Sequence, residues 1–349
     1  MAFQLGPVIF PSPYATIGLT ALAAMNAASA LNEAKGVNLP YSKFAHASKA
    51  PKKYSGKVGM VIAYAGGLVC SAAGCAWLLY KRGAGAAAPD NVAGSNLPVL
   101  GPLIKAGAGL LAKAVQAGRP MLVAGMLLGH YVKREAEVAL LHKYSGNMDA
   151  GSAWAIFTAY TMTTVINLAA VAAVPASLYA DASASGPKIA GVPAAAAVGS
   201  ALYVVGQAGN WYHHWLLARL RPSKPAPATT PATPAPAPAA SPATTPSKKD
   251  KKGAAASPAP AAPAPPPPEK AYLAPKGGLF GQVVCPHYFF ELVAWTGVAV
   301  ASQHYQGFLT VGGMTMYLMG RSKSTHKWYT DKKIEGFPGN RKCLVPGLY

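Results

Sequence analysis

Acidic residues are scarce in this sequence of 349 residues, and charged residues of both signs make up only 12% of it. A soluble domain carries about 25% charged residues, so this shortage excludes a typical soluble enzyme. Hydrophobic residues make up 52% of the chain, which excludes a wholly disordered protein. The combination predicts an all-α polytopic membrane protein, a bundle of about six to seven transmembrane helices.

The 11 acidic residues stand against 31 Lys and Arg, which leaves a net charge of +20. The low charge density argues against nucleic acid as a partner, and the basic residues lie between apolar stretches. They cluster after the first apolar segment and again at the C-terminus. The positive-inside rule places both clusters, and therefore the C-terminus, on the cytosolic side of a membrane.

Cysteine and histidine are also few, with four Cys, eight His and no CxxC motif. We therefore expect neither a disulfide framework nor a zinc site. The adjacent His213 and His214 raise a membrane di-iron oxygenase as an alternative, but no second His cluster completes such a site, so no metal is expected. The N-terminus lacks a positively charged leader region, which predicts that the first apolar segment stays as an anchor.

A spanning helix needs about 20 mostly apolar residues. Eight segments are candidates, and the third and last are short or interrupted: Tyr14–Leu31, Val58–Tyr80, Leu97–Val115, Met121–Leu141, Ala153–Tyr179, Ile189–Leu217, Val283–Gln303 and Phe308–Met319. The many Ala and Gly residues are typical of helices that pack closely in lipid.

The composition changes sharply between residues 222 and 269, which are mostly Pro, Ala, Thr and Ser with one short basic run. Such a stretch cannot bury a core, and its proline content blocks regular structure. We predict a disordered loop insertion there. It separates the N-terminal transmembrane helices at 1–221 from a C-terminal segment at 270–349.

Polar residues inside apolar segments are costly in a membrane and therefore indicate function. On a helix, Arg134 shares one face with Tyr131 at i,i+3 and with His130 at i,i+4. That face can present a phenol and a guanidinium to one ligand. The alternative is a helix end at the membrane interface, with Arg134 and Glu137 as an internal pair.

Two further polar groups follow. Asn210, His213, His214, Arg219 and Arg221 close an apolar segment, and such a set suits a phosphate-rich cofactor. The C-terminal block carries another set, although an aromatic and basic belt at a membrane face explains it equally well. Neither a phosphate-binding loop nor a Rossmann glycine motif is present. The C-terminal set is Lys276, His287, Glu291, Arg321, His326, Tyr329 and Arg341.

Together these segments resemble the steroid 5-alpha-reductase family, which includes very-long-chain trans-2-enoyl-CoA reductases and polyprenol reductases. The resemblance is greatest to the plant and algal branch of 3-oxo-5-alpha-steroid 4-dehydrogenase family proteins, and it covers most of the chain outside the insertion. It lies in KGGLFGQVVCPHYFFELVAW, GRSKSTHKWY and FPGNRKCLVP, supported by GNWYHHWLLARLR, HYVKREAEVALLHKYSG and YSKF at 41–44.

The resemblance implies an NADPH-dependent reductase of an activated C=C bond in a lipid that enters from the bilayer of the endoplasmic reticulum. Tyr131 matches the catalytic Tyr that polarises the substrate carbonyl, and Arg134 matches the Arg three residues later. The remaining matches are to cofactor-binding positions, at Asn210, His214, Arg221, His287, Glu291, Arg321, His326, Tyr329 and Arg341.

Two departures leave the substrate open between a 3-oxo-4-ene steroid and a trans-2-enoyl thioester. The Gln-Glu pair of the steroid reductases is missing, with Tyr64 near its place, and His214 replaces an acidic residue that the steroid reductases carry after the Asn. In addition, His287 stands where Asn is usual. Two other interpretations remain. One is a non-catalytic membrane protein that keeps the reductase fold. The other is an enzyme similar to the isoprenylcysteine methyltransferases, which would bind S-adenosylmethionine.

Overall fold

The computed structural model of the chain describes residues 8, 13–42, 44, 52–83, 118–144, 146–175, 177–179, 181, 186–189, 191–220 and 272–349. The chain divides into two units, one joining residues 1–221 with 273–349 and one spanning 222–272. The helices and strands named below all belong to the first unit. The expected apolar segment Leu97–Val115 and the insertion at 222–269 lie outside the described residues.

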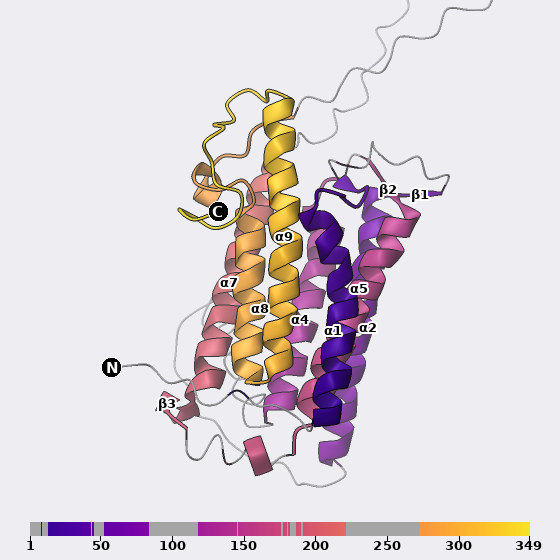
Figure 1. Cartoon of the computed structure of the whole chain (residues 1–349), viewed down its shortest axis with the longest axis vertical. Coiled ribbons are helices and arrows are strands. Elements are labelled where there is room, and N and C mark those ends of the chain that lie inside the picture. Colours follow the sequence, from indigo (N-terminus) through magenta and orange to yellow (C-terminus); the bar gives the residue numbers. More distant parts are fainter. Residues whose placement is uncertain are drawn as a thin grey trace, which may run out of the picture. The chain divides into compact units, whose positions relative to one another are not determined.

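Long helices dominate the described residues and run side by side as a bundle (Figure 1). This arrangement confirms the all-α class predicted from composition. The helices are α1 (Pro13–Ala34), α2 (Gly56–Gly83), α4 (Arg119–Ala136), α5 (Ala150–Ala172), α7 (Ala194–Arg219), α8 (Pro286–Ser302) and α9 (Tyr305–Asp331).

Short elements connect the helices. A π-helical turn, η2 (Glu137–Leu141), continues α4, and a 3-10 turn, η3 (Gly278–Gly281), precedes α8. Strand β1 (Lys53–Ser55) pairs antiparallel with β2 (Asn147–Asp149), which ties the start of α2 to the start of α5. Strands β3 (Lys188–Ile189) and β4 (Val192–Pro193) form a second antiparallel pair just before α7.

Several helix ends differ from the predicted segments. The helix α7 begins at Ala194 because β3 and β4 occupy the preceding residues, and α5 ends at Ala172. One of the two weakest segments, 308–319, lies mostly in the N-terminal half of α9, which extends to Asp331. The helix therefore carries His326 and Tyr329, which hydropathy had left beyond its end.

Two of the described helices are long and apolar enough to cross a membrane, at Gly56–Lys81 and Ala150–Ala172. They correspond to α2 and α5, which pack against each other in the bundle. The larger number of spans stays a prediction. Helices such as α4 and α9 carry buried charged side chains, Arg134 and Arg321 among them, and these side chains lower their hydropathy.

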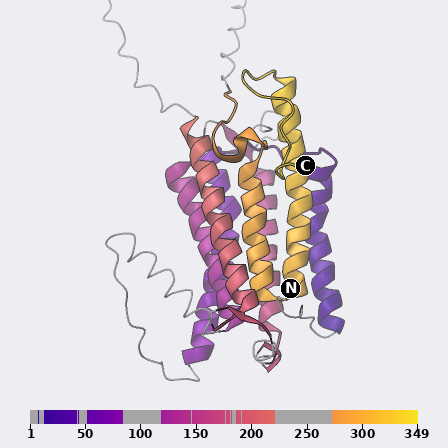
Figure 2. The ribbon, with the colours of Figure 1, turned by 90° about the vertical axis from the view of Figure 1, so that its left-hand side faces the viewer.

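Small residues bring α7 and α8 into close contact, as the composition predicted. A Cβ added at Gly206 would lie 2.6 Å from Ala294 Cα, and one added at Gly199 would lie 2.5 Å from Ala301 N. The two helices lie side by side in both ribbon views, with α9 on the other side of α8 (Figures 1 and 2). The backbones of α7 and α8 are therefore nearly in contact where these glycines lie.

The hydrophobic core lies between α4, α7 and α8, with contributions from α5. It contains Leu122, Leu127, Val171, Trp295 and Val298, all at most 3% exposed. Because this core holds the first turns of α4 inside the bundle, the polar last turns of α4 are buried as well. The bundle thus places a polar helix end in its interior.

Candidate active site

Polar side chains of α2, α4, α7 and α8 contact one another near one end of the bundle. The helix ends concerned lie at the upper end of the bundle in Figure 1. The chain direction alternates, so the C-terminal ends of α4 and α7 reach this end together with the N-terminal ends of α2 and α8. On α4, the side chains of His130, Tyr131 and Arg134 are buried, with 2%, 0% and 8% exposure. Their predicted common face is the one that the bundle encloses.

Arg134 connects three helices through its guanidinium. Its Nη1 lies 2.5 Å from Glu137 Oε2 and 2.9 Å from His214 Nδ1 on α7. Its Nη2 donates to the phenol oxygen of Tyr64 on α2. The internal Arg134–Glu137 pair considered as an alternative is therefore present, and the same guanidinium also has partners on two other helices.

A chain of polar contacts continues from Glu137 toward α8. Lys133 Nζ lies 3.0 Å from Glu137 Oε1 and also donates to Asn210 Oδ1 on α7. Asn210 Nδ2 in turn donates to Glu291 Oε2 at 2.9 Å and to the carbonyl of His287 at 2.8 Å. Four predicted cofactor residues on two helices are thereby brought together with the predicted catalytic Arg.

Sequence reasoning did not assign Lys133, Glu137 or His130 to the site. His130 Nε2 lies 3.4 Å from Glu291 Oε1, and its Nδ1 lies 3.0 Å from Gln207 Nε2. The signal was available, because Lys133 and Glu137 have the i,i+4 spacing of an ion pair within the polar run that ends α4. Two carboxylates, Glu137 and Glu291, balance the buried cations.

Tyr131 lies on the α2–α5 side of the same group. Its phenol oxygen accepts a hydrogen bond from Thr164 Oγ1 at 2.9 Å and lies 3.4 Å from the carbonyl oxygen of Tyr160. Its ring packs flat on Gly67 of α2, where an added Cβ would lie 2.7 Å from Tyr131 Cε2. The ring thus occupies a slot that only glycine permits.

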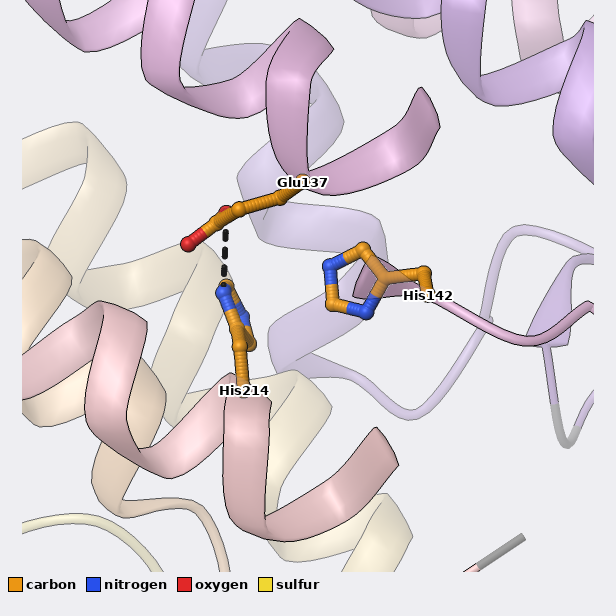
Figure 3. A group of neighbouring side chains, drawn as sticks. All are labelled: Glu137, His142 and His214. Carbon is orange, nitrogen blue, oxygen red and sulfur yellow. Dashed lines mark hydrogen bonds and ion pairs between the residues drawn. The ribbon is translucent and has the colours of Figure 1, made fainter. Parts of the chain in front are cut away.

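Three side chains of the site have the donor types of a metal centre. Glu137, His142 and His214 bring their ligand atoms within 4.8 Å of one another (Figure 3). Burial lowers the pKa of His142 to about 3, so its imidazole is neutral at physiological pH. However, Arg134 Nη1 already lies against both Glu137 Oε2 and His214 Nδ1, where a cation would have to bind. The guanidinium neutralises the carboxylate and repels a second positive charge.

We therefore expect that removal of metal ions leaves the protein unchanged. Incubation with EDTA or 1,10-phenanthroline should alter neither the unfolding temperature nor any turnover. Elemental analysis of the purified protein should find zinc and iron well below one ion per chain. A stoichiometric metal whose removal lowers the unfolding temperature would contradict this expectation, and a Glu137→Gln variant would then identify the ligand set.

Arg321 lies apart from this group, where it joins α9 to the end of α1 and to the residues that follow α1. It is 2% exposed, and its Nη1 lies 3.1 Å from Glu33 Oε1 and donates to the Leu39 carbonyl at 3.0 Å. Its guanidinium carbon lies 4.0 Å and 4.4 Å from the ring centroids of Tyr41 and Phe44. In this structure Arg321 binds the segment after α1, and the cofactor role predicted for it stays a prediction.

The last predicted residues gather around Phe337, beyond the end of α9. The ring of Tyr329 stacks on that of Phe337 at 4.7 Å, and His326 Nε2 lies 3.1 Å from the Gly339 carbonyl oxygen. Arg341 Nη1 donates to the Pro275 carbonyl at 3.1 Å. The predicted site residues thus form three separate groups, and Arg221 lies outside the described residues.

The fold and the buried ionic group define a helical-bundle protein with a polar interior site, and sequence comparison gives its relatives. Residues 265–349 match the family model described as 3-oxo-5-alpha-steroid 4-dehydrogenase. The predicted resemblance to the steroid 5-alpha-reductase family is thereby confirmed for the C-terminal segment, which contains α8, α9 and the residues around Phe337.

Individual relatives agree with the family match. The chain is 39% identical over 82 residues to "Steroid 5-alpha-reductase DET2" of Gossypium hirsutum, covering 22% of this chain and 30% of that protein. It is 39% identical over 81 residues to "3-oxo-5-alpha-steroid 4-dehydrogenase 1" of Homo sapiens, covering 23% and 31%. "Steroid 5-alpha-reductase DET2" of Arabidopsis thaliana is 38% identical over 82 residues, covering 22% and 30%. The match thus spans about three tenths of these relatives' length.

Proposed function

We propose that the protein is a membrane reductase that uses NADPH to reduce an activated C=C bond of a lipid, a 3-oxo-4-ene steroid or a trans-2-enoyl thioester. The observation that carries the proposal is the buried group formed by Tyr131, Arg134, Asn210 and Glu291. The helices that hold this group include α8, which lies in the segment similar to the steroid 5-alpha-reductases. Buried polar groups are costly in a membrane and are retained for function.

The residues of the site fit a nicotinamide cofactor chemically. Asn210 and Glu291 provide an amide and a carboxylate that suit a carboxamide, and Lys133 and Arg134 provide cations that suit phosphate. Trp295 Nε1 is buried and has no hydrogen-bond partner among the described residues, so one donor facing the interior is available to a ligand. When bound, the reduced nicotinamide supplies a hydride.

The chain's own residues would bind the substrate and stabilise the charge that develops on it. Tyr131 would redirect its phenol proton from the Tyr160 carbonyl oxygen to the substrate carbonyl oxygen, and it would keep accepting the hydrogen bond from Thr164. As the hydride adds at the β-carbon, the electron pair of the C=C bond moves toward that oxygen, and the enolate then takes a proton at the α-carbon. A donor fixed at the developing oxyanion lowers the barrier of this step.

The position of Tyr131 indicates the route of a lipid. Tyr131 lies between Gly67 of α2 and Thr164 of α5, the two helices that are apolar enough to span a bilayer. An apolar tail can therefore stay in lipid along these helices while the carbonyl reaches the phenol. Lys53 of β1 and Lys57 in the first turn of α2 lie at the end of the bundle where α4 ends, and Lys57 Nζ donates to the Ala139 carbonyl at 2.9 Å. By the positive-inside rule, these residues support a cytosolic position of the site and the C-terminus. The endoplasmic reticulum is the membrane that the family resemblance implies.

We expect Tyr131→Phe to lower kcat by about 10²–10³-fold while NADPH affinity stays unchanged, because one donor to the oxyanion is lost. The measurement is NADPH consumption by detergent-purified protein with a 3-oxo-4-ene steroid and with a long-chain trans-2-enoyl-CoA. Tyr80→Phe serves as the control, since the Tyr80 side chain is 76% exposed on α2. Wild-type protein that binds NADPH but reduces neither probe would point to another lipid. Absence of both binding and turnover would favour the non-catalytic interpretation.

A further inference from the structure

A second tyrosine of the site has the contacts of a hydrogen-bond donor held ready for a ligand. Tyr64 lies on α2, is 3% exposed, and belongs to the same buried cluster as Tyr131 and Val138. Its phenol oxygen accepts a hydrogen bond from Arg134 Nη2. Its ring lies 5.2 Å from the ring of Tyr160, which fixes its orientation from the side of α5.

The two phenols differ in what holds them. Tyr131 interacts with the hydroxyl of Thr164 and the carbonyl oxygen of Tyr160, both neutral groups of α5. Tyr64 interacts with a guanidinium that is itself held by Glu137 and His214. A phenol whose oxygen accepts from a cation keeps its own proton to donate, and the cation makes that proton a stronger donor.

We propose that Tyr64 is a catalytic residue, a second phenol that donates a hydrogen bond to the substrate carbonyl oxygen beside Tyr131. The inference rests on the proposed reductase function and deepens it. A carbonyl oxygen has two lone pairs, so it accepts from two donors at once. The substrate still gains one hydride at the β-carbon, which bound NADPH would supply, and one proton from water at the α-carbon, and Tyr64 undergoes no net change.

Arg134 then acts as a positioning residue for Tyr64. It lies 4.7 Å from the Tyr64 ring centroid as well as bonding the phenol oxygen, so ring and hydroxyl are both fixed. Negative charge that develops on the carbonyl oxygen is stabilised by the phenol proton, and the phenol oxygen is stabilised by the guanidinium behind it. The relay is electrostatic and requires no charged group in contact with the substrate.

The test compares Tyr64→Phe with wild type, using whichever of the two probes, 3-oxo-4-ene steroid or trans-2-enoyl-CoA, the wild type reduces. We expect kcat to fall by about 10²–10³-fold with unchanged NADPH affinity. Infrared difference spectra of the ¹³C=O-labelled substrate bound with NADP⁺ should show a higher carbonyl stretching frequency in the variant, because one hydrogen bond is lost. A purely structural role would leave that frequency unchanged.

Tyr305→Phe is the control, since it removes the phenol of another buried tyrosine, at the start of α9, where that phenol contacts Thr20; its kcat should stay within about threefold of wild type. Fluorotyrosine incorporated at position 64 keeps ring and hydroxyl, so it tests the proposal even where Tyr64→Phe fails to fold. The more acidic phenol should lower the carbonyl frequency. If the wild type is active and neither change at position 64 alters the rate or the carbonyl frequency, the inference about Tyr64 is wrong, while the proposed function stands. A wild type that neither binds NADPH nor reduces a probe would overturn the proposed function instead.

Discussion

Replacement of Arg134 by alanine is expected to lower the free energy of unfolding by about 3–5 kcal/mol and to abolish turnover. The guanidinium is buried and has partners on α2 and α7 as well as on its own helix. Its loss leaves Glu137 with one cation fewer in an interior that cannot solvate the carboxylate. Removal of one partner from a buried ion pair costs more than the pair contributes, because the other charge stays buried.

Thermal unfolding in detergent, followed with and without NADPH, measures this effect. Lys327→Ala is the matched control, because Lys327 also forms an ion pair one helical turn apart, with Asp331, but its side chain is 75% exposed. Exposed pairs contribute little, so this variant should unfold near the wild-type temperature. If both variants unfolded alike, the buried network would not hold the bundle together.

A second large effect is expected at the interface between α7 and α8. Gly206→Leu should prevent the two helices from closing, because even the Cβ would lie 2.6 Å from Ala294 Cα. Backbone atoms cannot move aside as a flexible side chain can, so the two helices must separate along their interface. The separation would also pull Asn210 away from Glu291, one turn further along, where the two are joined at 2.9 Å. We therefore expect loss of folded protein rather than a moderate loss of stability.

Gly312→Leu is the control for Gly206→Leu. Gly312 is also inside a long helix, α9, but nothing lies within 4 Å of an added Cβ there. Yield of monodisperse protein after detergent extraction, followed by thermal unfolding, should separate the two variants clearly. Equal yields would show that α7 and α8 do not pack as closely as their glycines indicate.

Local features were readable from the sequence because they depend on residues near one another in the chain. The apolar runs located the helices, and the spacing of His130, Tyr131 and Arg134 placed their side chains on one face. Helix ends were less predictable. The apolar run that extends toward Tyr179 stops being helical after Ala172, and the polar end of α9 continues to Asp331. Hydropathy measures preference for lipid, whereas helix ends are set by backbone hydrogen bonds.

The partners of the buried polar groups were decided by the tertiary structure alone. Arg134 finds Tyr64 70 positions earlier, and Arg321 finds Glu33 288 positions earlier. Nothing local distinguishes an arginine that will bind a ligand from one that will clamp a helix end. Which carboxylate or phenol reaches a buried guanidinium depends on how the helices pack, because a charge inside the bundle must be neutralised by whatever the packing brings beside it. The sequence by itself determined the helices, their small-residue packing and the polar face of α4, and the packing of the bundle decided the network that this face completes.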